Sequence, residues 1–188
     1  MTIEEKVAAV EEVMSSLDAA VQSFQIWSGL GCKTGCGKCC TKADIEATVL
    51  EFLPLAKYLY STGEAETWLE KLSGNSSEWC ALLDQAALAG MCTNYKYRGL
   101  ICRLFGYSAR VNKYSQRELV TCRTIKSEQS EKYLSANNLL VDNPVPVTSQ
   151  YYMQLHAIDF EMAREFFPIN EAIKRALQVI LQYYAYRS

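Results

Sequence analysis

The distribution of cysteine constrains the fold of this 188-residue chain more than any other feature of its sequence. All eight cysteines lie between Cys32 and Cys122, and four of them occur within positions 32–40, among closely spaced glycines. A single buried cysteine is common in an apolar core, but a cluster among glycines indicates metal binding or redox chemistry. Because His156 is the only histidine, a metal site in this chain would be built mainly from sulfur.

Length and composition limit the remaining possibilities. A chain of 188 residues suits a single domain, and an apolar fraction of 49% excludes disorder as its main state. The net charge of −2 argues against a protein that binds nucleic acid through its overall charge. We therefore predict one domain over 1–188, divided into an N-terminal amphipathic helix (1–30), a cysteine-cluster region (31–123) and C-terminal helices (124–188).

The N-terminal charge and the hydropathy of the chain predict a cytoplasmic protein. Glu4 and Glu5 occupy the region where a signal peptide carries positive charge. No uninterrupted apolar stretch of the sequence reaches the ~18 residues of a membrane span. Because thiols stay reduced in the cytoplasm, structural disulfides are not expected despite the even cysteine count.

Helical periodicity is clearest at the N-terminus. Apolar residues alternate at spacings of four and three along one seam, and Thr2 and Glu5 form a capping box at its start. The seam comprises Ile3, Val7, Val10, Met14, Leu17, Val21 and Phe24. Packing of this helix on its own domain is the simpler interpretation, and a homodimer through the seam is the alternative.

The middle of the chain mixes short elements with irregular segments. After a short extended start, a helix is expected over 50–60, and another over 67–72 that stops at Gly74. Two strands are expected within 107–122, joined near Asn112-Lys113. This hairpin follows the cysteine-rich stretch directly.

The C-terminal third is predicted to be helical, with a break at 143–146 where two prolines occur. One helix is expected to end at Pro168, and Asn170 is expected to cap the last helix. The apolar stripe of that helix contains Ile173, Leu177, Ile180 and Tyr184. The predicted fold is mainly α, with a helical body around an irregular cysteine-rich metal centre and one small β-hairpin.

The spacing of the cysteines suits ligation by thiolates. Cys36 and Cys39 are separated by two residues, a gap that lets one turn present two sulfurs to one metal. The side chains of the adjacent Cys39 and Cys40 diverge, so one of them serves a second ion, bridges a cluster or is simply buried. The other half of the site is expected to come from Cys80, Cys92 and Cys102.

Basic residues gather in the same parts of the chain. The segments 32–42 and 92–123 together carry ten basic residues and one acidic residue, which leaves nine basic and twenty acidic residues elsewhere. Four thiolates around one zinc ion carry two negative charges, which nearby cations would offset. Without a metal, the same cations would lower the pKa values of the thiols. A nucleic-acid surface is a minor alternative, because the chain contains no recognised binding motif.

Three ordered blocks of the sequence carry a resemblance to a known family. They are Cys32-x3-Cys36-x2-Cys39-Cys40, then Cys80-Ala-Leu-Leu-Asp84, then the stretch from Gly90 to Gly106 that contains Cys92, Arg98, Cys102 and Arg103. Together they resemble the CxxCxxCC family, the YkgJ-type cysteine-cluster proteins described as zinc- or iron-chelating. The resemblance covers about 32–123. It implies metal binding, and it implies that Arg98 and Arg103 support the bound cofactor.

We therefore predict a metal-binding protein that holds Zn2+ or an iron–sulfur cluster. The candidate metal ligands are Cys32, Cys36, Cys39, Cys40, Cys80, Cys92 and Cys102. Glycine-rich turns and nearby basic residues favour a cluster, because amide and cationic contacts to sulfur tune its potential. Two alternatives remain open. One is a metal-free thiol–disulfide redox protein that uses Cys36 and Cys39, and the other is an interaction module with a purely structural metal.

Three other residues have simpler interpretations. His156 is expected to be a surface or hydrogen-bonded histidine rather than a ligand. Asp84 is expected to cap a helix, and a hydrogen bond within the cysteine centre is the alternative. Cys122 is equally consistent with a ligand and with a buried thiol. With one histidine and no phosphate-binding loop, the sequence indicates no hydrolase or kinase chemistry and predicts no particular reaction.

Overall fold

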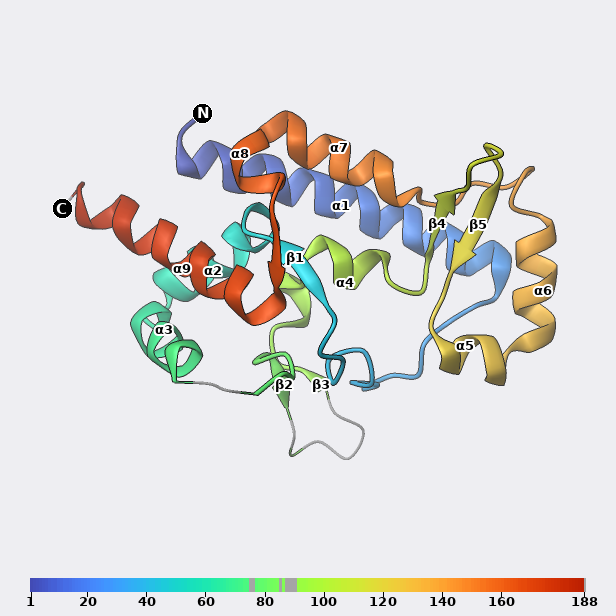
Figure 1. Cartoon of the computed structure of the whole chain (residues 1–188), viewed down its shortest axis with the longest axis horizontal. Helices are drawn as coiled ribbons and strands as arrows, with labels where there is room; N and C mark the ends of the chain where they lie inside the picture. The colour runs from blue at the N-terminus through green and yellow to red at the C-terminus, as the bar shows by residue number, and fades with distance from the viewer. Residues whose placement is uncertain (75–76, 85, 87–90, 188) are drawn as a thin grey trace. The chain divides into compact units, whose positions relative to one another are not determined.

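The computed structural model of the chain describes residues 1–74, 77–84, 86 and 91–187. Over these residues it contains nine α-helices and three short antiparallel strand pairs, which confirms a mainly α fold (Figure 1). No helix among them is both long and apolar enough to cross a membrane. The chain divides into two compact units, and the predicted single domain stays a prediction. Unit 1 comprises Met1–Glu12, Gly35–Gly99 and Leu155–Ser188, and unit 2 comprises Val13–Thr34 and Leu100–Gln154.

The N-terminal helix α1 (Ile3–Ser28) begins with the predicted capping box. The amide of Glu5 donates to Oγ1 of Thr2 over 3.2 Å, and the amide of Thr2 donates to Oε2 of Glu5 over 2.7 Å. Every residue of the predicted seam except Val21 is buried. The homodimer stays a prediction, and the seam that it would use is already buried in the single chain.

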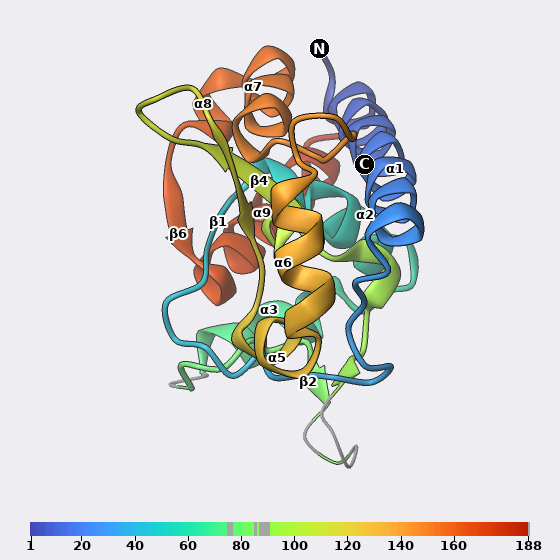
Figure 2. The same cartoon turned by 90° about the vertical axis from the view of Figure 1, so that its right-hand side faces the viewer.

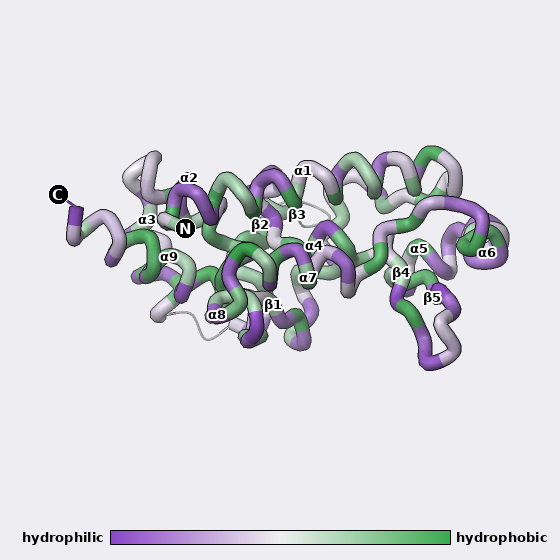
Figure 3. Tube along the Cα trace, turned by 90° about the horizontal axis from the view of Figure 1, so that it is seen from above, coloured by the Kyte–Doolittle hydropathy of each residue, from purple (hydrophilic) through white to green (hydrophobic). Residues whose placement is uncertain are grey.

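Unit 1 is organised around the C-terminal helix α9 (Ile169–Ala185), which packs against α2 (Leu53–Ser61) and α3 (Ala65–Ser73). Apolar and hydrophilic residues alternate along α9 (Figure 3), and its predicted stripe is buried at Ile173, Leu177 and Ile180. The expected helices over 50–60 and 67–72 are thus confirmed. The other elements are β1 (Glu46–Thr48), the 3-10 helices η1 (Leu50–Phe52) and η2 (Tyr95–Tyr97), β2 (Leu83–Asp84), β3 (Met91–Cys92), α8 (Phe160–Ala163) and β6 (Phe166–Pro168).

Two of the three strand pairs lie in unit 1 and were not predicted. β1 pairs antiparallel with β6, so that Ala47 lies opposite Phe167. β2 pairs antiparallel with β3, so that Leu83 lies opposite Cys92. Strands of two or three residues give too short an alternation of apolar and polar side chains to be recognised from sequence.

Unit 2 contains the rest of α1, the predicted hairpin and several helices. Figure 2 shows α6 following α5 directly. Its elements are α4 (Leu100–Leu104), β4 (Ser108–Val111), β5 (Arg117–Val120), α5 (Arg123–Glu128), α6 (Ser130–Asn138) and the first residues of α7 (Thr148–Ile158). Its core comprises Phe24, Leu30, Ala109, Leu119, Ile125, Ala136, Leu140 and Val145.

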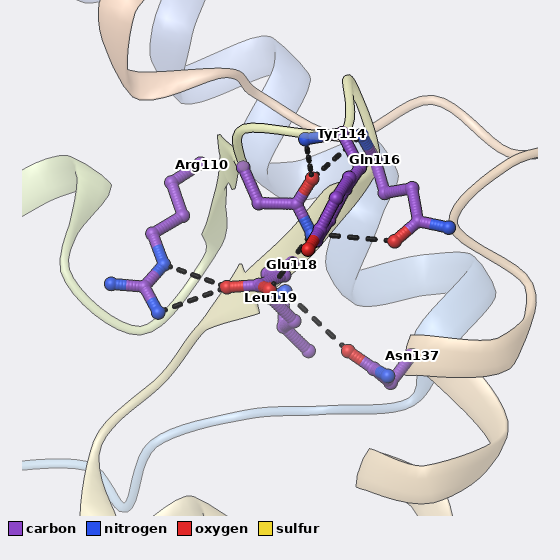
Figure 4. A network of polar contacts seen from close by, with 7 residues as sticks. Arg110, Tyr114, Gln116, Glu118, Leu119 and Asn137 are labelled. Carbon is purple, nitrogen blue, oxygen red and sulfur yellow. Dashed lines mark hydrogen bonds and ion pairs between the residues drawn. The ribbon is translucent and has the colours of Figure 1, made fainter.

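Polar contacts fix the β4–β5 hairpin at its tip and along one edge (Figure 4). The Glu118 carboxylate accepts hydrogen bonds from Nε of Arg110 over 2.9 Å and from Nδ2 of Asn112 over 3.0 Å. Oδ1 of Asn137, in α6, accepts a bond of 3.4 Å from the amide of Leu119. The predicted hairpin is therefore confirmed, with Asn112 at the start of its turn.

Three local predictions are wrong. The helix that was expected to reach Pro168 ends at Ile158, because Asp159 adopts an extended conformation and caps the separate helix α8 through Met162. Pro168 itself occupies the N-cap position of α9, so Asn170 does not cap that helix. Asp84 lies in β2 and accepts a bond from the amide of Ala86, so it caps no helix.

Candidate metal centre

The two units share the cysteines unequally. Unit 1 contains Cys36, Cys39, Cys40, Cys80 and Cys92, and unit 2 contains Cys32, Cys102 and Cys122. All eight are thiols in the structure, rather than halves of disulfides. The candidate centre described below lies within unit 1.

The first part of the centre is a tightly turned loop that carries Cys39 and Cys40. The amide of Cys40 donates to the carbonyl oxygen of Gly37 over 2.9 Å, and the amide of Lys42 donates to that of Cys39 over 3.3 Å. Gly35, at the start of the loop, has a φ of 72°, a backbone conformation that favours glycine. The glycine-rich sequence therefore produces the irregular turns that were predicted for it.

The second part of the centre contains Cys80 and Cys92. The amide of Cys80 donates to the carbonyl oxygen of Cys40 over 2.9 Å, which joins the two cysteine-bearing segments directly. Cys92 lies in β3, and the amide of the following residue, Thr93, donates to the carbonyl oxygen of Leu82 over 2.8 Å. The short β2–β3 pairing therefore holds Cys92 next to the segment that follows Cys80.

Four thiols interact within this arrangement. The Cys40 thiol is hydrogen-bonded to the thiols of both Cys39 and Cys80. The charge on Cys92 raises the pKa of Cys40, and the charge on Cys39 raises the pKa of Cys92. Cys36 is half-buried in the same loop, three residues before Cys39. The structure thus joins the chain segments that carry four of the seven predicted ligands, with a fifth nearby in the chain.

Hydrogen bonding and burial shift the pKa values of these thiols upwards. The hydrogen bond with Cys40, together with burial, raises the pKa of Cys39 far above its ordinary value. The bond with Cys39 lowers the pKa of Cys40, but the bond with Cys80 and burial outweigh it and raise this pKa to about 12. Burial also raises the pKa of Cys92. These shifts favour the neutral thiol form of Cys39, Cys40 and Cys92.

Arg98 contributes positive charge to the centre. Its positive charge lowers the pKa of Cys39 and of Cys92, against the larger effects that raise both. The guanidinium carbon lies 3.6 Å from the centroid of the Tyr95 ring, and Nε donates to the carbonyl oxygen of Tyr95 over 3.2 Å. Arg103 lies in unit 2, where it is buried and forms an ion pair with Asp18.

The donor set fits a thiophilic metal. Four cysteine sulfurs are the ligands of structural zinc sites and of iron–sulfur clusters, and the glycine-rich loop allows their backbones to approach closely. Among the residues that the structure describes, no three His, Cys, Asp or Glu side chains are already arranged around a common ion position. The cysteines of the described residues therefore form no complete coordination sphere in this structure.

A pocket of about 860 Å³ borders the thiol cluster at Cys80. Its walls include Trp68 and Lys71 of α3 and the exposed Trp79. The Lys71 ammonium lies 4.2 Å from the centroid of a Trp68 ring and donates to the carbonyl oxygen of Ala81 over 3.4 Å. The cluster therefore adjoins a space that is large enough for a small molecule.

Cys122, His156 and Cys32 each form a hydrogen bond outside the thiol cluster. Cys122 is the N-cap of α5, and its sulfur accepts a bond of 3.3 Å from the amide of Ile125. Nε2 of His156 lies 3.1 Å from the carbonyl oxygen of Ala163, which confirms a hydrogen-bonded histidine. Cys32 is exposed in unit 2, where its amide donates to the Tyr107 hydroxyl over 2.8 Å.

Comparison with protein families gave a match. A family model described as a putative zinc- or iron-chelating domain matches residues 31–131, more than half of the chain. The chain belongs to the CxxCxxCC family. The match includes every cysteine of the chain, and it also includes Gly90, which lies outside the described residues. Comparisons with curated proteins and with solved structures gave no match.

The sequence did not indicate the contribution of the C-terminal region to this CxxCxxCC centre. Asn170, at the start of α9, hydrogen-bonds to the segment that carries Cys80. An asparagine near a helix start is usually interpreted as a cap, and no local pattern distinguishes the two roles. The contact joins residues about ninety positions apart, so only the folded chain reveals it.

Proposed function

We propose that this chain is a metal-binding protein in which Cys39, Cys40, Cys80 and Cys92 hold a zinc ion or an iron–sulfur cluster. One observation carries the proposal: backbone hydrogen bonds join the three chain segments that carry these four cysteines within one unit. The family to which the chain belongs is described as zinc- or iron-chelating, which supports the same function. An isolated buried thiol needs no such partners.

The other predicted ligands stay predictions. Cys36 is the best placed of them, since it lies in the same loop as Cys39 and Cys40. Cys32 and Cys102 belong to unit 2, as does Arg103. Arg98 is proposed to offset the negative charge of the bound thiolates, because its charge already acts on Cys39 and Cys92.

A bound metal would connect the irregular loop to the β2–β3 pair, and a redox-active cluster would in addition carry electrons. The positive charge of Arg98 and the glycine-rich loop favour a cluster, since both tune the potential of cluster sulfurs. We also place the protein in the cytoplasm, where its thiols would stay reduced until they bind metal.

The metal-free redox alternative is less well supported. A thiol that exchanges disulfides is activated by a lowered pKa, in an electropositive and partly exposed environment. The pKa of Cys39, the second cysteine of the predicted exchanging pair, is raised instead. Hydrogen bonding with Cys40 and burial cause this shift, and both oppose formation of the reactive thiolate.

Anaerobic purification followed by elemental analysis and visible absorption spectroscopy tests the proposal. A brown protein with stoichiometric iron and sulfide would identify an iron–sulfur cluster, and a colourless protein with stoichiometric zinc would identify a zinc site. If the metal is lost during purification, reconstitution with Zn²⁺ or with iron and sulfide should restore it. A protein that holds neither metal after reconstitution, with all thiols reacting freely, would refute the proposal.

A further inference from the structure

The side-chain amide of Asn170 forms hydrogen bonds with the segment around Cys80 through both its oxygen and its nitrogen. Its Oδ1 accepts a bond of 2.8 Å from the amide of Ala81. Its Nδ2 donates to the carbonyl oxygens of Trp79 over 2.8 Å and of Ser77 over 3.3 Å. One side chain thus contacts three backbone groups on the two sides of Cys80.

These contacts fix the backbone at Cys80 itself. The carbonyl of Trp79 and the amide of Ala81 are the groups that flank Cys80 in the chain, and Asn170 holds both. The remaining amide, that of Cys80, is held by the carbonyl oxygen of Cys40. With its backbone bonded on each side, Cys80 has little freedom except rotation of its side chain.

The same stretch of chain is also anchored to the segment that follows the first cysteine loop. The residue before Asn170, Ile169, donates its amide to the carbonyl oxygen of Ile45 over 2.9 Å. β6, directly upstream, pairs with β1, and Phe167 within β6 is covered by the Arg175 guanidinium at 4.0 Å from its ring centroid. Residues 166–170 therefore hold the chain that follows Cys40 and the chain that carries Cys80.

We propose that Asn170 is a positioning residue of the metal centre, which holds Cys80 in register with Cys40 so that both sulfurs bind one metal or cluster. The proposal rests on the metal-binding function proposed above and extends it beyond the family-matched residues 31–131. It makes the first turn of the C-terminal helix α9 part of the centre. Asn170 does not contact the metal in this role.

The chemistry of the side chain makes the proposal specific. Only a primary amide offers one acceptor and two donors from the same planar group. Aspartate at this position would still accept the hydrogen bond from the Ala81 amide. Its second carboxylate oxygen would, however, face the carbonyl oxygens of Trp79 and Ser77 and repel them. Alanine would leave the carbonyl oxygens and the amide of this segment to water, and the segment would gain freedom.

The test compares Asn170→Ala and Asn170→Asp with the wild type and with a control, Asn138→Ala, on the exposed surface of α6. Zn²⁺ affinity is measured by competition with a chromophoric chelator, and the Co²⁺-substituted proteins report thiolate coordination by their absorption spectra. Circular dichroism of each metal-free protein checks the fold. We expect both Asn170 variants to bind Zn²⁺ about 10–100-fold more weakly, the loss typical of residues that orient a ligand. Their Co²⁺ spectra should be altered, and the control should match the wild type.

Each outcome has a distinct meaning. Wild-type affinity and an unchanged Co²⁺ spectrum in both Asn170 variants would overturn the positioning role while leaving metal binding intact. A wild type that binds no metal would overturn the proposed function itself. If the variants fail to fold, amide hydrogen exchange of the wild-type protein tests the positioning role instead. The proposal predicts that the Ala81 amide exchanges slowly, and more slowly still when metal is bound. Rapid exchange at Ala81 in the metal-loaded protein would contradict the proposal.

Discussion

The backbone amide of Cys80 donates a hydrogen bond of 2.9 Å to the carbonyl oxygen of Cys40. This single bond joins two segments that are distant in the sequence, and each of them carries a candidate metal ligand. Because the two segments are joined, a change on either side is expected to affect the whole centre.

Replacement of a cluster cysteine should abolish stoichiometric metal binding. Cys39→Ala and Cys80→Ala each remove one of four sulfurs, so we expect metal affinity to fall by more than the ~10–100-fold caused by loss of a supporting residue. Elemental analysis after gel filtration measures the result. The matched control is Cys122→Ser, which should keep full metal content, and loss of metal in that variant would instead make Cys122 a ligand.

The role of Cys122 as the N-cap of α5 predicts a stability effect. Cys122→Ala removes the acceptor for the amide of Ile125, so we expect the free energy of unfolding to fall by about 0.5 kcal/mol, the low end for a lost cap. Cys122→Ser restores an oxygen acceptor and should unfold at least as late in urea as the wild type. Equal stability of the alanine and serine variants would show that the sulfur bond contributes nothing.

Gly99 lies against a buried surface that leaves no room for a side chain. A Cβ at this position would lie 2.8 Å from Oε2 of Glu51 and 2.8 Å from Cζ of Phe52, and both residues are almost fully buried. We therefore expect Gly99→Ala to lower the free energy of unfolding by about 1–3 kcal/mol.

Gly31→Ala is the matched control for that substitution, because nothing lies within 4 Å of its added Cβ. Its free energy of unfolding, measured in urea, should stay within about 0.5 kcal/mol of the wild-type value. If Gly99→Ala were as stable as Gly31→Ala, Glu51 and Phe52 would not pack closely against the backbone of Gly99.

The ion pair between Lys6 and Asp159, at 2.5 Å, predicts acid sensitivity. Burial raises the pKa of Asp159, but the hydrogen bonds from Lys6 and from the Met162 amide lower it more, so the pKa lies below its ordinary value of 3.8. A carboxyl group with a lowered folded-state pKa stabilises the protein above its unfolded-state pKa. That contribution is lost as the pH falls through the folded-state value.

Asp159→Asn isolates this effect, since asparagine can still accept from the Met162 amide but carries no charge. At neutral pH we expect the variant to be less stable by on the order of 1 kcal/mol. The difference from the wild type should shrink as the pH falls below the ordinary pKa of aspartate. Urea unfolding at several pH values measures it, and a difference independent of pH would exclude an electrostatic origin.

The sequence by itself determined the helices with long apolar periods, and it predicted a thiol-based metal centre. The seam of α1, the stripe of α9 and the Asn112 hairpin all follow from patterns within a few residues, which local backbone geometry enforces. The predicted ligands followed from residue type, because clustered thiols have few uses other than metal binding or redox chemistry.

Only the tertiary structure decided which thiols meet. Cys39, Cys40, Cys80 and Cys92 interact through backbone bonds and a two-residue strand pair, and neither leaves a periodic signal in the sequence. Local preference was also misleading at Asn170, where a residue typical of helix caps instead holds a distant loop. The physical reason is the same in both cases: amide and carbonyl groups left unpaired by irregular backbone must find partners, and the fold rather than the neighbouring sequence supplies them.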